Sequence, residues 1–363
     1  MGIGLYKVKV SNEFEDHDWD TFLEKNPTGQ YEQTSLWAQV KALHNWQPVR
    51  VVASDREAIV AGAQALVRKV PFVGSIGYVS KGPVFASDDD VLIQIVIDRL
   101  CRIAKEYHIQ YFIVHPPENN QTLIKFLINK GFKKELIIDV VGATVMIDLS
   151  LDLDEILANM KKKTRQYIRR GERKQIKVRL GYKEDIGTFY QLMLETCRRQ
   201  GVFPNPSDEN YVNELWRVFN RYGYITLLLA EYNSEVLSAI LAISFRETVR
   251  AWKIGWSGRY GDYRPNYVLW WELIKWAKSQ GYKYLDFVGI DQNIARAILS
   301  NKQLSNIGNR DMTSFKLGFG GNPVILSDAL VYVNNLILSW IYDLILSRIG
   351  KLPFARRILR KIS

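Results

Sequence analysis

The first 148 residues alternate between the two hydrophobic periods that distinguish helices from strands. Apolar residues recur at helical spacing over 19–26, 35–43, 88–108 and 121–132. Runs rich in β-branched residues predict strands over 48–54, 58–70, 75–85 and 109–116. Thr34 or Ser35 is placed to cap the second of these helices at its N-terminus. Alternating helices and strands predict an α/β-type domain.

Residues 149–328 repeat this rhythm. Helices are predicted over 152–174, 184–201 and 266–281, and strands over 176–181, 224–257 and 282–290. The region 224–257 is long enough for three strands, with a hairpin turn at Asn233-Ser234. Residues 102–114 align with 275–288 at a constant offset of 173 residues from Ala104 and Ala277 onward. Such a period indicates a duplicated domain, although two helix–strand units can also converge on this likeness. We therefore expect two domains, 1–148 and 149–328.

The last 35 residues, 329–363, break the rhythm. Residues 329–346 are largely apolar, but Asn334, Asn335 and Asp343 interrupt them, and a membrane-spanning helix needs about 20 apolar residues. Six cations and no acid follow within 344–363. An apolar face followed by basic residues is typical of an amphipathic helix on an anionic membrane surface. The alternative is a helix packed on the second domain with a solvated basic end.

Composition places the chain among folded cytoplasmic proteins. With 47% hydrophobic residues, it has enough apolar surface to exclude a mostly disordered chain. Cys101 and Cys197 are the only cysteines, too few for a disulfide framework. The N-terminus lacks the apolar core of a signal peptide. We expect a cytoplasmic protein that lies peripherally at the inner face of the membrane.

The net charge of +11 is concentrated in two places. Residues 161–179 hold ten Lys and Arg and one acid, and residues 344–363 hold the six cations noted above, so the remainder is mildly acidic. A basic run is either a solvated face or an anion site. We favour the second, with a phosphate-rich ligand such as tRNA or a pyrophosphate. Tyr167 is the only aromatic residue in the run, so base stacking is not predicted. The candidate phosphate-binding residues are Lys161, Lys162, Lys163, Arg165, Arg169 and Arg170.

Several common catalytic motifs are missing. The chain has no phosphate-binding GxxxxGK[ST] loop, no GxGxxG after its first strand and no GxSxG. Its four histidines lack metal-ligand spacing. We therefore predict neither a metal site nor a bound cofactor. An enzyme with this sequence would act by orienting its substrates and by electrostatics.

Five segments in order resemble the Fem family of peptidoglycan bridge peptidyltransferases. They are NPTGQYEQTSLWAQVKALHNWQP (26–48), GYVSKGPVF (77–85), the basic run KKKTRQYIRRGERKQIKV (161–178), YRPNYVLWWELIKWAKSQGYKYLDFVGI (263–290) and TSFKLGFGG (313–321). The resemblance implies two tandem domains of the acetyltransferase-like (GNAT) fold, α/β (α+β) in class and related by duplication. The long helical arm of some members is absent, and the C-terminal amphipathic helix would be an addition. It also implies an aminoacyltransferase that moves an amino acid from aminoacyl-tRNA to the side-chain amine of a peptidoglycan precursor, forming an amide in the interpeptide bridge.

The resemblance implies two catalytic residues. Lys316, in Ser-Phe-Lys-x-x-Phe, matches a family lysine thought to stabilise the charge that develops at the transferred ester. A fixed cation suits that role, because attack of an amine on an ester creates an oxyanion. Phe315 would shape the site, and core packing is its equal alternative.

Other residues match positions that would bind substrate. Those in the first half are Trp37, Lys41 and Lys81, and those in the second half are Arg264, Asn266 and Asp286. Lys41 would bind the phosphates of the precursor, although a surface lysine is the simpler interpretation of the residue alone. Trp37 is equally a core residue, Lys81 belongs to a turn that Gly82-Pro83 requires anyway, and Asn266 could instead cap its helix. The family usually has glycine where Val288 stands, two residues after Asp286.

One departure bears on the acceptor. Family members that use the soluble UDP-linked muropeptide carry Thr-x-Arg-Pro where this chain has Phe203 and Asn205 in VFPNP (202–206). Together with the tail, this favours the lipid-linked precursor, lipid II. Two other functions stay open: an acyl-CoA-dependent N-acyltransferase on the same fold, against which the missing Gly-rich pyrophosphate loop counts, and a non-enzymatic membrane- or RNA-binding protein.

Overall fold

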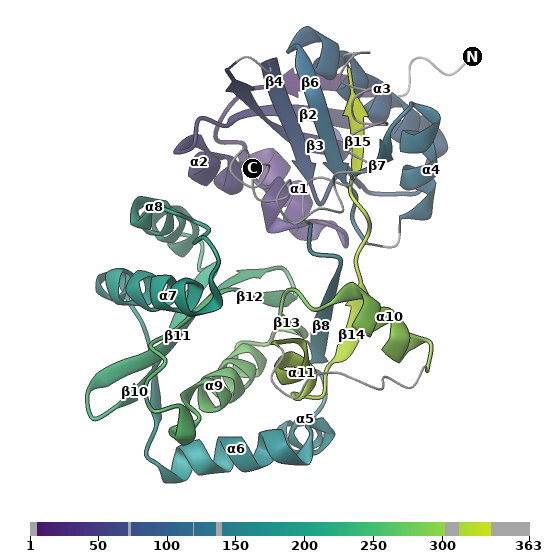
Figure 1. Cartoon of the computed structure of the whole chain (residues 1–363). Helices are drawn as coiled ribbons and strands as arrows, with labels where there is room; N and C mark the ends of the chain where they lie inside the picture. Colours follow the sequence, from purple (N-terminus) through teal and green to yellow (C-terminus); the bar gives the residue numbers. More distant parts are fainter. Residues whose placement is uncertain (1–5, 72–73, 119, 136–139, 302–311, 335–363) are drawn as a thin grey trace. The chain divides into compact units, whose positions relative to one another are not determined.

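The computed structural model describes residues 6–71, 74–118, 120–135, 140–301 and 312–334 (Figure 1). The chain forms two compact units, described here separately. The first comprises the described residues within Met1–Val140 and Leu326–Ser363, and the second Val141–Ile325. Each unit is a mainly antiparallel sheet packed with helices.

The sheet of the first unit has the strand order β1-β2-β3-β4-β6-β15-β7, and β5 pairs with β3. Its strands are β1 (Lys7–Ser11), β2 (Gln47–Asp55), β3 (Ala58–Val70), β4 (Gly74–Ser80), β5 (Val84–Phe85), β6 (Ile109–His115), β7 (Lys133–Lys134) and β15 (Leu330–Val333). Its helices are α1 (His17–Lys25), the 3-10 turn η1 (Tyr31–Gln33), α2 (Ser35–Ala42), α3 (Asp90–Glu106) and α4 (Gln121–Asn129). The predicted cap is confirmed, since the Thr34 hydroxyl accepts a hydrogen bond from the backbone N–H of Trp37.

The second unit has the strand order β14-β8-β13-β12-β11-β10-β9. Its strands are β8 (Ala143–Asp148), β9 (Lys177–Leu180), β10 (Ile225–Tyr232), β11 (Glu235–Phe245), β12 (Thr248–Trp256), β13 (Tyr284–Asp286) and β14 (Asn322–Ile325). Its helices are α5 (Leu153–Asn159), α6 (Lys162–Arg173), η2 (Lys183–Asp185), α7 (Ile186–Gln200), α8 (Glu209–Asn220), η3 (Gly261–Tyr263), α9 (Pro265–Ser279), α10 (Gln292–Leu299) and α11 (Met312–Leu317). The predicted hairpin lies between β10 and β11, where Asn233 and Ser234 both have positive φ.

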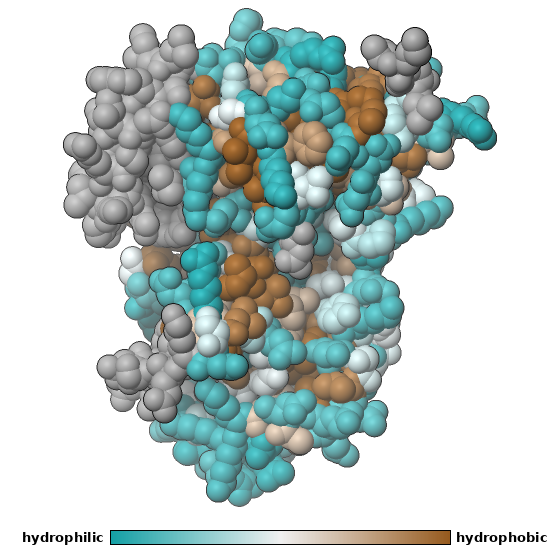
Figure 2. Space-filling view, turned by 90° about the vertical axis from the view of Figure 1, so that its right-hand side faces the viewer, coloured by the Kyte–Doolittle hydropathy of each residue, from teal (hydrophilic) through white to brown (hydrophobic). Residues whose placement is uncertain are grey.

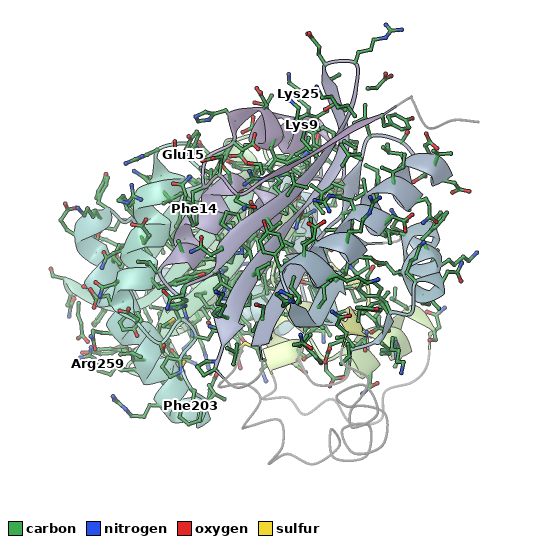
Figure 3. All side chains as sticks on the ribbon, turned by 90° about the horizontal axis from the view of Figure 1, so that it is seen from above. Lys9, Phe14, Glu15, Lys25, Phe203 and Arg259 are labelled. Atoms are coloured by element: carbon green, nitrogen blue, oxygen red, sulfur yellow. The ribbon has the colours of Figure 1, made fainter. Side chains whose placement is uncertain are left out.

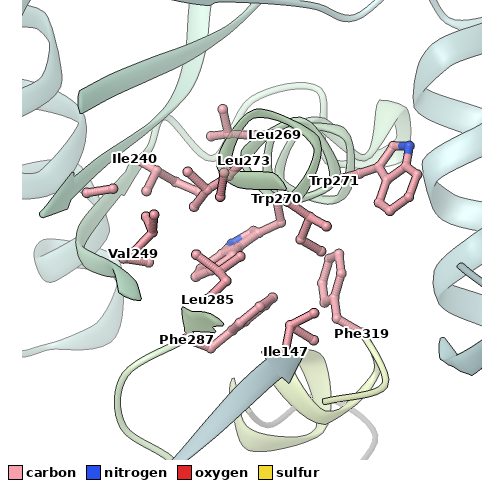
Figure 4. Close-up of a cluster of buried hydrophobic side chains, with 14 of the residues drawn as sticks. Ile147, Ile240, Val249, Leu269, Trp270, Trp271, Leu273, Leu285, Phe287 and Phe319 are labelled. Atoms are coloured by element: carbon pink, nitrogen blue, oxygen red, sulfur yellow. The ribbon is translucent and has the colours of Figure 1, made fainter. Parts of the chain in front are cut away.

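The core of the second unit lies between its sheet and α9. Hydrophobic side chains from α9 face those of β8, β11, β12 and β13 (Figure 4). Trp270 stacks on Phe287 with ring centroids 4.1 Å apart, and Phe319 contacts both rings. This packing joins α9 and the end of β13 to the segment that follows α11, and so holds three parts of the candidate site together.

The two segments that align in the sequence occupy equivalent places in the two sheets. In the first unit α3 connects β4 to β6, which run parallel, and in the second α9 connects β12 to β13, which are also parallel. All the other strand pairs of the described sheets are antiparallel. Each aligned segment is thus the helix and second strand of one parallel crossover.

The structure corrects the predicted domain boundaries. We placed residues 143–148 in the first domain and 329–363 in a separate tail. Instead, β8 pairs with β13 and β14 in the second sheet, while β15 inserts between β6 and β7 in the first. The hydrophobic pattern identifies a strand but not its partner, because backbone pairing is not encoded in periodicity. The amphipathic helix predicted for the tail falls on residues 335–363, outside the described residues.

Other expectations differ in detail. The single helix predicted over 152–174 is two helices, α5 and α6, because the backbone is extended at Met160 and Lys161. The strand predicted over 282–290 is limited to β13, and α8, α10 and α11 were not predicted. None of the described helices is long and apolar enough to cross a membrane. On the face drawn in Figure 2, hydrophilic side chains surround smaller groups of hydrophobic ones in each unit.

Candidate active site

Strands β12 and β13 of the second unit pair over only three residues each. Thr248–Arg250 pair with Tyr284–Asp286, and β12 then continues to Trp256 paired with β11 but without a partner on its β13 side. In the first unit the equivalent strands β4 and β6 pair along their whole length. A cavity of about 400 Å³ lies at the end of β12 that extends beyond β13. Its lining comes from α7, β12, α9 and α11 and comprises Thr196, Arg199, Gln200, Ile254, Trp256, Asn266, Met312 and Phe315.

Lys316 follows the lining residue Phe315 on α11 and is not itself among the residues that line the cavity. Its Nζ donates hydrogen bonds to the carbonyl oxygens of Val288 and of Gly289, the latter at 2.7 Å. Burial lowers the pKa of Lys316 to about 8, and the nearby charge of Asp286 partly opposes this. An ammonium has three N–H donors, and no acceptor among the described residues takes the third. Within the described residues, Lys316 is therefore an ammonium held by two carbonyls, with a third N–H that no acceptor takes.

Asp286 holds the loop that supplies those two carbonyls. It is buried at the end of β13, forms an ion pair with Arg250 at 2.9 Å, and accepts a hydrogen bond from the Val288 N–H at 2.8 Å. The Thr144 hydroxyl donates to Oδ1 of Asp286, the oxygen that also accepts from the Val288 N–H, while Arg250 contacts Oδ2. Val288 has φ +49, a conformation that strains a β-branched residue and that glycine adopts freely. Asp286 thus positions Lys316 through the loop.

The aromatic ring of Phe315 lies at the border between the cavity and the aromatic core. It lines the cavity and also packs edge-on against Tyr267 and Phe319, with centroids 4.9 and 5.3 Å away. Asn266 lines the same cavity and accepts a hydrogen bond from the Ser238 hydroxyl. It does not cap α9, since Arg264 is the N-cap residue and Pro265 is the first residue of the helix. The structure therefore brings Phe315, Lys316, Asn266 and Asp286 into one region.

Arg264 lies further along the same aromatic contacts. Its guanidinium stacks on the ring of Tyr167 from α6, 4.1 Å from the ring centroid, and Tyr167 packs against Tyr267 at 4.8 Å. The Nε of Arg264 is buried without a hydrogen-bond partner among the described residues.

Helix α6 carries most of the basic run. Its buried face consists of Thr164, Ile168 and Gly171, and a Cβ at Gly171 would lie 2.3 Å from a methyl group of Val268 on α9. The other candidates, Lys161, Lys162, Lys163, Arg169 and Arg170, are exposed and form no ion pair within the described part of the chain. Arg165 differs, because its guanidinium donates to the carbonyl oxygens of Ala158 and Met160 at the end of α5. These hydrogen bonds satisfy carbonyl groups at the C-terminal end of α5.

The remaining candidates belong to the first unit. Trp37 is buried on α2 and packs edge-on against Tyr31, and the Lys41 ammonium lies 5.5 Å from the Trp37 ring centroid. Lys81 is buried after β4 and forms an ion pair with Glu118 at 3.3 Å. Nothing in the first unit corresponds to the Lys316 arrangement among its described residues.

Several lining residues were not predicted. Arg199 stacks on the ring of Trp256, 4.9 Å from its centroid, and the indole Nε1 of Trp256 is buried without a hydrogen-bond partner in the described chain. No motif marks these residues, because they meet only when α7 packs on β12. Phe203, in the segment that departs from the family, is 72% exposed and lies at the periphery of the view in Figure 3. No group of three or more potential metal ligands occurs among the described residues.

Comparison with known proteins shows which families and folds this chain resembles. The model of the FemAB family matches residues 14–140, and that of an acetyltransferase (GNAT) domain matches residues 158–295. The chain is 22% identical over 362 residues to a lipid II:glycine glycyltransferase of Staphylococcus haemolyticus, covering 80% of this chain and 85% of the relative. These matches support a Fem-family protein of GNAT-like fold.

Another relative of this Fem-family protein is the UDP-N-acetylmuramoylpentapeptide-lysine N(6)-alanyltransferase of Weissella viridescens. It is 25% identical over 290 residues, covering 75% of this chain and 83% of the relative. Both relatives are named as transferases, one of a glycyl and one of an alanyl group.

Solved structures confirm the fold. The crystal structure of FemX has a TM-score of 0.78 at 18% identity, covering 93% of this chain and 99% of that one. A tandem GNAT protein from the clavulanic acid biosynthesis pathway has a TM-score of 0.52 at 7% identity, covering 90% and 98%. The predicted mixed α/β class with two tandem GNAT-like domains is therefore confirmed.

Proposed function

We propose that this Fem-family protein transfers an amino acid from aminoacyl-tRNA to the side-chain amine of a lipid-linked peptidoglycan precursor. The observation that carries the proposal is the arrangement of Lys316, a buried cation fixed by two carbonyls beside the cavity of the second unit. The names of the relatives, which include lipid II:glycine glycyltransferases, support the class of reaction and the acceptor.

The reaction needs stabilisation of one transient charge. The acceptor amine attacks the ester carbonyl of the aminoacyl-tRNA, and its oxygen becomes an oxyanion in the tetrahedral intermediate. The unused N–H of Lys316 donates to that oxygen. The intermediate then collapses, the amide bond forms, the ester C–O bond breaks, and the amine proton passes to the departing ribose oxygen. Phe315 and Asn266 line the space for the aminoacyl group.

The basic residues serve the two anionic substrates. The exposed cations of α6 contact tRNA phosphates, whereas Arg165 holds the end of α5. In the first unit Lys41, with Trp37 beneath it, binds the phosphates of the precursor. Lys81 forms an ion pair with Glu118, and its role is to stabilise the turn after β4.

The decisive experiment supplies labelled aminoacyl-tRNAs with lipid II and looks for the aminoacylated precursor, with acetyl-CoA as the competing donor and the UDP-linked muropeptide as the competing acceptor. Transfer from acetyl-CoA alone would refute the donor. Lys316→Met should lower kcat by about 10²- to 10³-fold. Lys278→Met is the matched control, because Lys278 also donates to a backbone carbonyl, that of Leu149 at 2.9 Å, from the last turn of α9.

We also propose that the protein acts at the inner face of the membrane, with its basic C-terminal segment on anionic lipid. Residues 330–333 are part of the first sheet, so the informative deletion removes residues 335–363 and leaves β15 in place. We expect the shortened protein to lose sedimentation with anionic vesicles. Equal sedimentation of both proteins would refute the role of the segment.

A further inference from the structure

Tyrosines that are dispersed in the sequence gather beside α6 in the second unit. Tyr232 ends β10, and its ring centroid lies 5.1 Å from that of Tyr260 and 5.0 Å from that of Tyr263. Tyr260 and Tyr263 belong to the η3 segment before α9 and lie 5.4 Å apart. We call these three residues the tyrosine cluster.

The cluster adjoins cations of the basic run. The Lys174 ammonium, directly after α6, lies 5.1 Å from the Tyr263 ring centroid. Arg264 follows Tyr263 in the chain and stacks on Tyr167 of α6. The surface therefore combines aromatic rings with the positive charges that α6 exposes.

A second series of ring contacts begins at Tyr167, the ring on which Arg264 stacks, and leads to the candidate site. Tyr167 packs against Tyr267, and Tyr267 against Phe315, which lines the cavity beside Lys316. Each step joins ring centroids less than 5 Å apart, 4.8 and 4.9 Å. A continuous aromatic path thus leads from the basic helix to the cavity.

The exposure of Tyr260 distinguishes the tyrosine cluster from ordinary core packing. Tyr263, Tyr232 and Tyr267 are half-buried against the hydrophobic core. Tyr260 is 41% exposed and lies outside that core cluster. An exposed ring contributes little to burial, but it offers a flat face to a base.

We infer that the tyrosine cluster binds the unpaired 3′-terminal nucleotides of the tRNA by stacking and so guides the aminoacyl ester toward Lys316. This inference rests on the proposed function. Proteins that hold single-stranded nucleic acid combine a cationic groove for phosphates with aromatic side chains for bases. The sequence, with Tyr167 as the one aromatic residue of the basic run, does not predict stacking; the fold supplies the other rings.

The test compares two RNAs: an intact deacylated tRNA and the same tRNA trimmed of its three 3′-terminal nucleotides. Tyr260→Ala should weaken binding of the intact tRNA about fivefold or more and leave binding of the trimmed tRNA unchanged. Tyr260→Phe keeps the ring and should bind as the wild type does. Lys162→Gln should weaken both RNAs and reduce the salt dependence of binding.

The matched control is Tyr222→Ala. Tyr222 is also exposed and stacks on another tyrosine, Tyr224, at 5.9 Å, but this pair lies before β10, at the opposite end of that strand from Tyr232. An equal effect of Tyr222→Ala and Tyr260→Ala would overturn the inference, as would equal losses for the two RNAs. A transfer assay on the same preparations separates the two proposals. Wild-type protein that transfers nothing from aminoacyl-tRNA refutes the function, whereas the RNA comparison tests the cluster without chemistry.

Discussion

As the pH rises, the buried ammonium of Lys316 loses its proton. We expect this to increase the stability of the protein and to decrease its activity. Replacing Lys316 with Met keeps a similar volume and removes the charge. In the folded protein the Lys316 pKa is lowered to about 8, from an ordinary value of 10.5. Between these values the unfolded chain binds more protons than the folded one, so the free energy of unfolding rises with pH. Below pH 8 both states are charged, and the cost of burying the charge is present in full.

The magnitude follows from the difference between the two pKa values. The full cost corresponds to roughly 3 kcal/mol, of which about 2 kcal/mol is recovered between pH 7 and pH 9.5. The wild type should therefore gain about 2 kcal/mol of stability over that range relative to Lys316→Met. The comparison cancels the titration of groups that the two proteins share. In Lys316→Met the Val288 and Gly289 carbonyls lose their donor. The cost of this loss does not depend on pH, so it does not contribute to the change between pH 7 and pH 9.5.

The assay is urea unfolding followed by tryptophan fluorescence, at several pH values from 7 to 9.5 for both proteins. Transfer activity of the wild type should fall over the same range, because only the ammonium form donates to the oxyanion as a cation. A difference in unfolding free energy that stays flat across this range would refute the desolvation of Lys316. Activity that persists above pH 9 would refute the need for its charge.

Three further substitutions test the surrounding structure. Asp286→Asn removes the charge that raises the Lys316 pKa, so the activity should fall at lower pH than in the wild type. The loss of the Arg250 partner should also lower the free energy of unfolding in urea by about 3 kcal/mol. An unchanged pH profile would contradict the coupling between Asp286 and Lys316. Gly171→Ala should cost about 1–3 kcal/mol because of its contact with Val268, and an unchanged denaturation midpoint would argue against that packing. Arg165→Ala should cost about 1 kcal/mol and spare tRNA affinity, which a loss as large as that of Lys162→Gln would disprove.

Local patterns were sufficient for most of the helices and strands that the sequence predicted. The helix over 88–108 is α3, because its apolar residues recur on one face and Asp89 caps its start. The prediction failed at Met160 and Lys161, where the basic run continues in a helical pattern across a break in the backbone. Helix α8 was also not predicted, although Tyr211, Leu215 and Trp216 are buried on one of its faces.

The candidate site was predictable only where a motif marks it. Phe315 and Lys316 were found by their resemblance to the family, and their setting agrees with the roles that the resemblance implies. Asp286 was expected to bind substrate, but its carboxylate is occupied by Arg250, Thr144 and the Val288 N–H, so we propose that it positions Lys316 instead. Arg199 and Trp256 have no motif, because they are distant in the chain and meet across α7 and β12.

By itself, the sequence determined the alternating helices and strands, the repeated helix–strand unit and the two basic segments, because each is a local pattern of side chains. The tertiary structure decided which strands pair. It placed β8 in the second sheet and β15 in the first, since a sheet edge accepts any strand of suitable register, whatever its distance along the chain. It also decided the chemistry of the site. The pKa of Lys316 and the gathering of the tyrosines both depend on burial and contacts between residues far apart in the chain.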